Sequence, residues 1–408
     1  MTEPGRRDVL RGLAAAGLGA AAGVAGGWAV AEARPFESSQ SDGSGGGTGI
    51  GPVDPHGPYQ AGIARPATPQ PHGVMAVLDL ADAPTATVGA SDFVVGLQAL
   101  CAHLGEAITA LTSPAGSTGV DSSGAELLDG PGDLTITVGL GPRLVRAVDP
   151  SLPGAEELPR FTSDDGVTTD RIGGDILLAA YSSNPNDADH AVRWLSSLAP
   201  GASLRWSQRL FRGPGRGTVT RNPLGFHDGI IVPHGDTELG QHVWISDGPF
   251  AGGTICVVRR LRLDSSGFHG ESQARQEAII GRRRHDGSPL SGGEQGDEVD
   301  LLAKSPDGQY VVPARSHVRA AHPSFTGSSL MLRRGYAFDD GALGDDPNVR
   351  DAGLMFTCFQ RELRTFVQTQ HRLDETDDLT EYATPTASAT FLILPGFTPD
   401  RPLGFALR

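Results

Sequence analysis

The chain has 408 residues, and its 48 aspartates and glutamates against 33 lysines and arginines give a formal net charge of −15 at pH 7. Because phosphate contacts need a basic face, this balance argues against nucleic acid as a partner, whereas an acidic surface is ordinary for a soluble exported enzyme. The length is sufficient for one large or two medium domains with a buried core.

The first 33 residues have the pattern of a twin-arginine export signal. Arg6 and Arg7 precede an uncharged, Gly- and Ala-rich stretch from Gly12 to Val30, and small residues follow for cleavage. A membrane anchor is the alternative, but a stretch of Ala and Gly inserts weakly into a bilayer, so we expect no anchor in the mature form. The twin-arginine machinery carries folded proteins, which suits a chain that binds a cofactor before export. We therefore expect a periplasmic or extracellular location.

Residues 34–58 are mostly Ser, Gly, Pro and Asp, which predicts a flexible linker. From 59 to 215 the apolar periods predict an N-terminal domain in the order β-α-β-β-α-β, which is the ferredoxin-like pattern. Its strands are expected at Gly73–Leu80, Leu134–Leu140, Asp175–Tyr181 and Ser203–Leu210, and its helices from Ser91 to Leu111 and near Ala188–Leu198.

The same order recurs from 216 to 408, which predicts a C-terminal ferredoxin-like domain and an internal duplication. Its elements are expected at Thr254–Leu263 (strand), Ser272–Ile280 (helix), Ser329–Arg333 and Leu354–Phe359 (strands), Glu362–Leu373 (helix) and Ala389–Leu394 (strand). The expected fold class is α+β, with antiparallel sheets packed face to face and helices outside. A long insertion, 281–328, interrupts this half, and such insertions often hold ligand sites.

Three motifs in the second half carry an acid, an imidazole and a guanidinium. They are Gly225-Phe226-His227-Asp228-Gly229, Ser316-His317-Val318-Arg319 and Leu330-Met331-Leu332-Arg333-Arg334-Gly335-Tyr336. Peroxide cleavage at haem iron needs a group that moves a proton between the two oxygens and a fixed positive charge for the departing oxygen. It also needs an axial ligand on the opposite face, for which neutral imidazole is common. The three motifs together therefore supply the groups that a haem peroxidase needs, although each motif alone is a weak signal.

From about Tyr59 to Pro395, the motifs and the sequence around them resemble the dye-decolourising peroxidase family in order and spacing. Further landmarks of that family are Tyr59–Ile63, Leu134–Pro142, Gly252–Thr254 with Val257–Arg260, Gln276–Arg283 and Ser328–Tyr336. Among its branches, the twin-arginine-exported deferrochelatase/peroxidase type is nearest. The chain departs from the pattern at Ile230, where a small hydroxyl residue is usual, and at His322-Pro323, where Asn-Pro is frequent. These departures bear on the shape of the distal loop and on packing beneath the proximal helix.

The resemblance implies roles for particular residues. Asp228 is expected to be the distal acid and base, Arg333 the distal charge stabiliser and His317 the axial iron ligand. The second ring nitrogen of His317 is expected to donate to a carboxylate, either Asp377 or Asp378. Arg319 and Gly229 are further expected cofactor contacts. No Cys-x-x-Cys occurs, so haem b is expected to be bound non-covalently, and Cys101, Cys256 and Cys358 are expected to be buried free thiols.

The expected substrates are hydrogen peroxide and an organic reductant, such as a bulky dye or a phenol. A bulky reductant is excluded from a pocket closed by Asp228, so electrons are expected to travel through surface aromatic residues, for which the candidates are Trp194, Trp206, Trp244, Tyr310 and Tyr336. An exported haem-binding or iron-uptake protein with little peroxide turnover is the main alternative, and a chlorite-dismutase-like enzyme ranks below it. The sequence leaves open the natural reductant and whether the chain forms a homo-oligomer.

Overall fold

The computed structural model describes residues 51–81, 91–113, 127, 129–344 and 346–407. The predicted export signal and most of the predicted linker lie outside these residues. The last part of that linker is described, and it contacts the fold, because Pro55 is buried and the Gly57 amide donates to the Phe397 carbonyl at 3.1 Å. The chain therefore joins the folded body before Tyr59.

The first half contains the predicted β-α-β-β-α-β order. Its elements are β1 (His72–Leu80), α1 (Ser91–Thr112), β2 (Thr135–Leu140), β3 (Ile176–Ser182), α3 (Pro185–Ser197) and β4 (Ala202–Phe211). The strands form an antiparallel sheet in the order β4-β1-β3-β2. Helix α3 begins where Asn184 accepts a hydrogen bond from the Asn186 amide, with Pro185 at the first helical position. Short elements α2 (Pro142–Val148), η2 (Asp164–Gly166) and η3 (Thr169–Arg171) connect β2 to β3.

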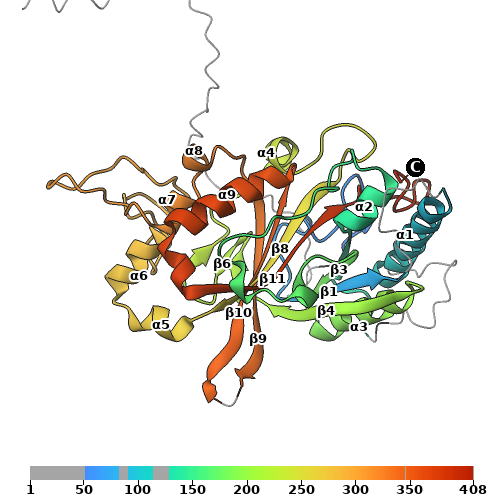
Figure 1. The fold of residues 1–408 in the computed structure, drawn as a ribbon, viewed down its shortest axis with the longest axis horizontal. Coiled ribbons are helices and arrows are strands. Elements are labelled where there is room, and N and C mark those ends of the chain that lie inside the picture. Colours follow the sequence, from blue (N-terminus) through green and yellow to red (C-terminus); the bar gives the residue numbers. More distant parts are fainter. Residues whose placement is uncertain (1–50, 82–90, 114–126, 128, 345, 408) are drawn as a thin grey trace, which may run out of the picture. The chain divides into compact units, whose positions relative to one another are not determined.

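The second half repeats this arrangement with β8 (Thr254–Leu263), α6 (Gln273–Ile280), β9 (Leu332–Leu343), β10 (Asp346–Gln360), α9 (Leu363–Thr376) and β11 (Ala383–Ile393). The order β11-β8-β10-β9 matches that of the first sheet, strand for strand. The strand expected at Ser329–Arg333 was placed too early, because Ser328 is held in a turn by Thr326 and Thr369 and pairing with β10 starts only at Leu332. The β9–β10 hairpin is also longer than expected and extends beyond the sheet (Figure 1).

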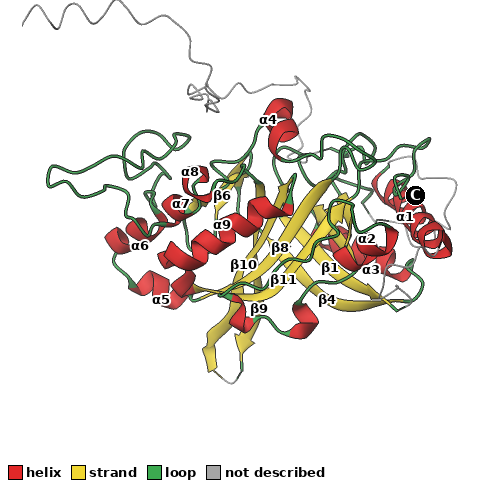
Figure 2. Ribbon diagram, turned by 45° about the horizontal axis from the view of Figure 1, so that its top comes forward, coloured by secondary structure: helices red, strands yellow, loops and turns green. Residues whose placement is uncertain are grey.

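The two sheets face each other and meet at both edges, which closes an eight-stranded barrel. Few residue pairs close the barrel at its two seams. Strands β2 and β11 pair at Leu140↔Leu392 and Gly139↔Ile393, and strands β4 and β9 pair at Phe211↔Ala337. Side chains from both sheets fill the interior, and a second core lies between the outer faces and helices α1, α3 and α9. Figure 2 shows α9 lying across the strands of the second sheet. Strand β3 is apolar from Ile176 to Ala180, in keeping with the burial of both of its faces.

The segment between α6 and β9 carries α7 (His317–Ala320) and α8 (Pro323–Thr326). Its long loop is held from inside by Arg282, which is 5% exposed and donates to the carbonyls of Gly287, Gln295 and Asp297, each at 2.9 Å. Burial lowers the pKa of Arg282 to about 10. Between the halves lie the small sheet of β5 (Gly215–Arg216), β6 (Val219–Arg221) and β7 (His227–Asp228), and then helix α4 (Gly235–His242). Two short helices complete this half, α5 (Ser265–Gly270) after β8 and η4 (Asp378–Tyr382) before β11.

Among the described residues, one helix, α1, is long and apolar enough to cross a bilayer by length and composition. Its buried face, which includes Leu97, Leu104 and Ile108, packs in the outer core, as expected for a core helix of a folded domain. The three cysteines are buried and free, which confirms the expectation for the thiols.

Candidate active site

Asp228 lies at the end of β7, in a turn that needs glycine. The amide of Gly229 donates to Asp228 Oδ1 at 2.6 Å, and Gly229 itself has φ +79°. A Cβ added at position 229 would lie 2.4 Å from the carbonyl oxygen of Thr218, so no larger residue fits. The Asp228 side chain is 28% exposed. The glycine turn therefore fixes one carboxylate oxygen and directs the other toward β9.

Arg333 faces this carboxylate from the second residue of β9. Its Nε lies 4.0 Å from Asp228 Oδ1, and its side chain is also 28% exposed. Neighbouring strand residues point to opposite faces, so Arg333 lies on the outer face of the barrel while Arg334 points inward. Arg334 is 2% exposed and donates to the carbonyls of Gly62 and Ile63. Of this arginine pair, only Arg333 can act on a group beside Asp228.

His317 is the first residue of α7 and is oriented by Asp377. Its Nδ1 lies 2.6 Å from Asp377 Oδ2, and Asp377 is 2% exposed and also caps η4 through the Leu379 amide. Asp378 is turned away and pairs with Arg315 and Arg275 instead. Of the two carboxylates that the sequence left open, the structure places Asp377 on the imidazole.

The other ring nitrogen of His317, Nε2, makes no hydrogen bond to any described residue, and the side chain is 38% exposed. Burial lowers the pKa of this imidazole, but the charge and hydrogen bond of Asp377 outweigh burial, so the net shift is upward. Arg333 and Asp228 are close enough to act on the same pKa, the first lowering it and the second raising it. The charges of Arg333 and Asp228 therefore reach the imidazole of His317.

Arg319, which was expected to contact the cofactor, is hydrogen-bonded to the main chain in this structure. It is 7% exposed, and its guanidinium donates to the carbonyls of Leu301, Val312 and Pro313. A guanidinium committed to three main-chain oxygens stabilises the loop before α7 and leaves little for a ligand. Arg319 therefore holds the chain before His317 through main-chain carbonyls, as Arg282 does for the loop nearer α6.

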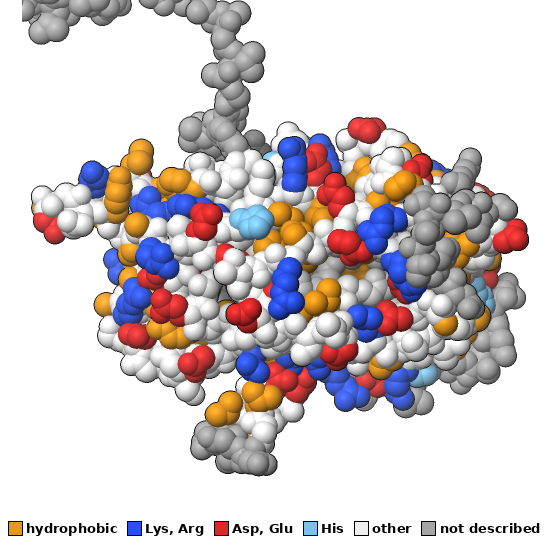
Figure 3. Space-filling model, in the orientation of Figure 1, with side chains coloured by type: hydrophobic (Ala, Val, Ile, Leu, Met, Phe, Trp, Pro, Cys, Tyr) orange, Lys and Arg blue, Asp and Glu red, His pale blue; other side chains and the backbone are white. Residues whose placement is uncertain are grey.

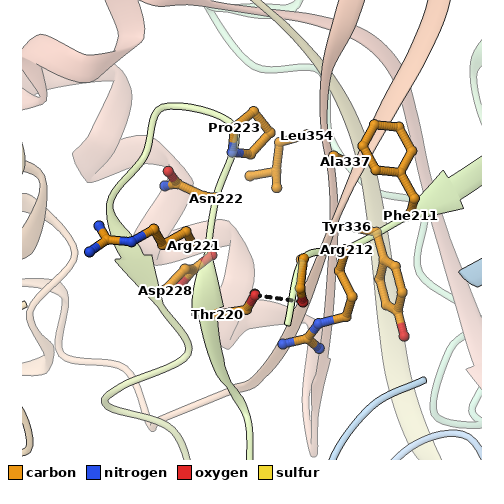
Figure 4. Close-up of a pocket in the computed structure, with 12 residues that line it drawn as sticks. Phe211, Arg212, Thr220, Arg221, Asn222, Pro223, Asp228, Tyr336, Ala337 and Leu354 are labelled. Atoms are coloured by element: carbon orange, nitrogen blue, oxygen red, sulfur yellow. Dashed lines mark hydrogen bonds between the residues drawn. The ribbon is translucent and has the colours of Figure 1, made fainter. Parts of the chain in front are cut away.

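A cavity of about 160 Å³ ends at Asp228 (Figure 4). Its wall comes from the end of β4, from β6 and β7, and from β9 and β10. Figure 4 shows Asp228 on one side and Phe211 and Tyr336 on the other, with Leu354 near Pro223. Most of the wall is apolar, and Asp228 is the carboxylate in it. Within the described residues, no group of three or more His, Cys, Asp or Glu side chains could hold a metal ion by itself.

Comparison with known proteins identifies the family. Residues 219–398 match the family described as Dyp-type peroxidase, C-terminal. The chain is 34% identical over 286 residues to a dye-decolorizing peroxidase of Thermobifida fusca, covering 64% of this chain and 65% of that protein. A crystal structure of a DyP-type peroxidase from Cellulomonas bogoriensis has a TM-score of 0.77 and 32% identity, and the match covers 88% of this chain and 99% of that one. The chain belongs to the DyP-type peroxidase family. The resemblance seen in the sequence and its expected fold class are both confirmed.

A deferrochelatase of Yersinia pestis is also similar, with 31% identity over 287 residues that cover 65% of this chain and 64% of that protein. The alignments to this DyP-type chain span less than two thirds of the length of both curated relatives. The chain is thus similar both to a protein named dye-decolorizing peroxidase and to one named deferrochelatase, and these two names describe different activities.

The aromatic residues suggested for electron transfer in this DyP-type chain differ in exposure. Trp206, Trp244 and Tyr336 are buried, and Trp194 is partly buried, whereas Tyr310 is 46% exposed. The guanidinium carbon of Arg319 lies 4.7 Å from the centre of the Tyr310 ring. Among the five candidates, Tyr310 is therefore the exposed one, and its ring packs against Arg319 of α7.

Sequence reasoning missed Gly335, which lies against Asp228. The signal was present, because a strand period of two puts residue 335 on the same face as Arg333. The strand expected at Ser329–Arg333 ends before residue 335, so the prediction did not place Gly335 on this face, although the motif includes it.

Proposed function

We propose that this chain is a haem peroxidase that reduces hydrogen peroxide and oxidises bulky dyes, phenols or other organic reductants. The observation that carries the proposal is the pairing of Asp228 with Arg333 in the same electrostatic environment as a His317 imidazole held by Asp377. Membership of the DyP-type family supports it.

The donor set fits haem b held without a covalent link. His317 offers Nε2 as an axial ligand, and Asp377 on Nδ1 would fix the ring and raise its basicity. The cysteines are buried in apolar surroundings and offer no thiol for attachment. When bound, haem supplies the iron that exchanges electrons with peroxide and reductant.

The protein's own groups would handle the proton and the charge. The Asp228 carboxylate would accept the proton of the peroxide oxygen nearer the haem, called the inner oxygen. It would return this proton to the other, outer oxygen, which leaves as water. Arg333 would stabilise negative charge on the departing oxygen. Gly229 would contribute by holding Asp228 Oδ1 through its amide.

Replacing Asp228 with Ala tests the proposal. The variant should keep haem, since His317 is untouched, but its reaction with one equivalent of hydrogen peroxide should slow by about 10²–10⁴-fold in stopped-flow absorbance. Asp236→Ala, which removes an exposed carboxylate on α4, should react like the wild type. If Asp228→Ala reacts with hydrogen peroxide as fast as the wild type, Asp228 is not the proton-transfer group.

The second candidate function is an exported haem-binding or iron-uptake protein with little peroxide turnover. The similarity to a protein named deferrochelatase favours it. The same His317 would serve both functions, so haem binding alone does not separate them. Under this alternative the wild type would bind hemin but react slowly with peroxide, and Asp228→Ala would hardly change iron release from bound haem.

We further propose that residues 1–33 direct export by the twin-arginine machinery to the periplasm or the cell exterior, that 34–58 separate this signal from domains at 59–215 and 216–408, and that the mature form has no membrane anchor. The strand order shared by the two halves supports the domain division. Replacing Arg6 and Arg7 with Lys should leave the full-length precursor in the cytoplasm, as detected by fractionation. Export of the double-lysine chain at the wild-type level would contradict the signal.

A further inference from the structure

Position 335 is a place on β9 where a side chain would meet the Asp228 carboxylate. A Cβ built on Gly335 would lie 3.2 Å from Asp228 Oδ2 and 3.2 Å from Leu354 Cδ1. The backbone here is ordinary extended strand, paired with Phe356 of β10, and would accept any residue. A side chain at position 335 is therefore disfavoured by Asp228 and Leu354, and not by the backbone conformation.

The carboxylate has little freedom to retreat from such a side chain. Asp228 Oδ1 is held at 2.6 Å by the Gly229 amide, and Arg333 Nε lies 4.0 Å away on the same side of the strand. A push on Oδ2 of a few tenths of an ångström would therefore turn the carboxylate about its fixed oxygen. The turn would change the geometry between the proton-transfer group and the positive charge.

Gly335 also forms part of the cavity that ends at Asp228. Asp228, Gly335 and Leu354 all line it, so a side chain at 335 would lie beside the carboxylate at the cavity wall. Gly213 lines the same cavity, but a Cβ added there would meet no atom within 4 Å. The cavity thus contains one glycine that touches the carboxylate and one that does not.

We propose that Gly335 is a positioning residue for Asp228, because its lack of a side chain sets where the distal carboxylate rests. The inference rests on the proposed peroxidase function and deepens it. Gly335 acts on the reaction through Asp228 and takes no part in proton transfer itself.

Gly335→Ala in the haem-loaded protein tests the inference. The second-order rate constant for hydrogen peroxide should fall by about tenfold or more, because misplacement of a catalytic group by a fraction of an ångström is costly. The KM for peroxide should rise, while kcat at saturating peroxide and limiting reductant stays near the wild-type value. The same change at Gly213 is the matched control and should leave both constants unchanged. A Gly335→Ala rate constant equal to that of the wild type would overturn the inference.

The contact with Leu354 has to be separated from the contact with Asp228. Leu354→Val removes the Cδ1 atom, so the double variant Gly335→Ala/Leu354→Val relieves that neighbour only. The peroxide rate should stay low relative to Leu354→Val alone if the alanine acts through Asp228. Recovery of the rate in the double variant would show that packing against Leu354 was the cause, and the inference would fail.

A second cycle covers the case in which Gly335→Ala does not fold or bind haem. In the Asp228→Ala background the carboxylate beside position 335 is gone, so the double variant Asp228→Ala/Gly335→Ala should fold and bind haem and should react with peroxide no more slowly than Asp228→Ala alone. A loss of folding or rate that persists in this background would overturn the inference. If the wild type itself fails to react with peroxide, the proposed function fails instead, and the two failures are thereby distinguished.

Discussion

The carboxylate of Asp377 decides how the imidazole of His317 is presented. It is almost fully buried, accepts from Nδ1 at 2.6 Å and is anchored by the Leu379 amide, so the ring has one favoured orientation and one favoured tautomer. Asp378 is the next residue in the chain, yet it serves the unrelated task of pairing with Arg315 and Arg275. Adjacent carboxylates at the start of η4 thus have distinct roles.

Asp377→Asn should lower the affinity for hemin by about 10–100-fold, because the outer partner of a ligating histidine orients the ring and raises its basicity. The measurement is an absorbance titration of the apoprotein with hemin. Asp378→Asn is the matched control, and its affinity should be unchanged. A loss of hemin affinity in Asp378→Asn with no loss in Asp377→Asn would show that Asp377 is not the functional partner of His317.

The raised pKa of His317 gives a pH dependence with a definite sign. Iron needs Nε2 without a proton, so hemin affinity should be full above this pKa and fall as pH drops through it, by about tenfold per pH unit. The stability that the His317–Asp377 pair gives the apoprotein runs the other way: it is present below the pKa of the unfolded chain and lost as pH rises through the raised pKa. Asp377→Asn should move the fall in hemin affinity to lower pH. Hemin affinity that is independent of pH, or that increases toward acid, would contradict this account.

Between elements, a buried ion pair connects the two halves of the barrel. Asp164 of η2 lies 2.6 Å from Arg259 Nη2 on β8, and their side chains are 5% and 1% exposed. Asp164 also accepts from the Phe161 amide at 2.9 Å, and Arg259 lies over the Phe161 ring. Removing one partner of such a pair leaves the other charge buried and unpaired.

Asp164→Ala should therefore destabilise the fold by about 3–5 kcal/mol, measured by urea unfolding of the haem-loaded protein. Asp339→Ala is the comparison, since Asp339 and Arg350 form a pair on the β9–β10 hairpin in which both side chains are more than a third exposed. This change should cost less than about 1 kcal/mol. Equal losses for the two variants would show that burial does not decide the strength of these pairs.

The elements themselves could largely be predicted from the sequence, because most of them have a clear apolar period. Strand β8 was placed at its observed bounds, and α6 and α9 were placed with their capping positions Ser272 and Glu362. The early parts of β10 and β11 could not be predicted, because they are polar or contain proline and are strands only through pairing with a neighbour. The strand period could place Gly335 on the face of Arg333, but the close approach of Asp228 to that face joins residues 107 positions apart and could not be predicted.

At the scale of the molecule, two halves with the same strand order build one barrel, and the site lies on the outer face of the second half. Barrel closure could not be read from sequence, since it depends on a few residue pairs at the β2–β11 and β4–β9 edges. On the side seen in Figure 3, positive and negative side chains are interspersed among the described residues, so this side is not a basic face. The first half contributes Phe211 to the cavity that ends at Asp228, so both halves form its wall.

The most direct test of the central claim is the visible absorbance spectrum of the purified chain, loaded with hemin, before and after one equivalent of hydrogen peroxide. The account predicts an intense haem band in the wild type that changes rapidly with peroxide, weak hemin binding in His317→Ala, and normal binding without the rapid change in Asp228→Ala. A wild-type chain that takes up no hemin, or one whose haem spectrum is indifferent to peroxide, would contradict it.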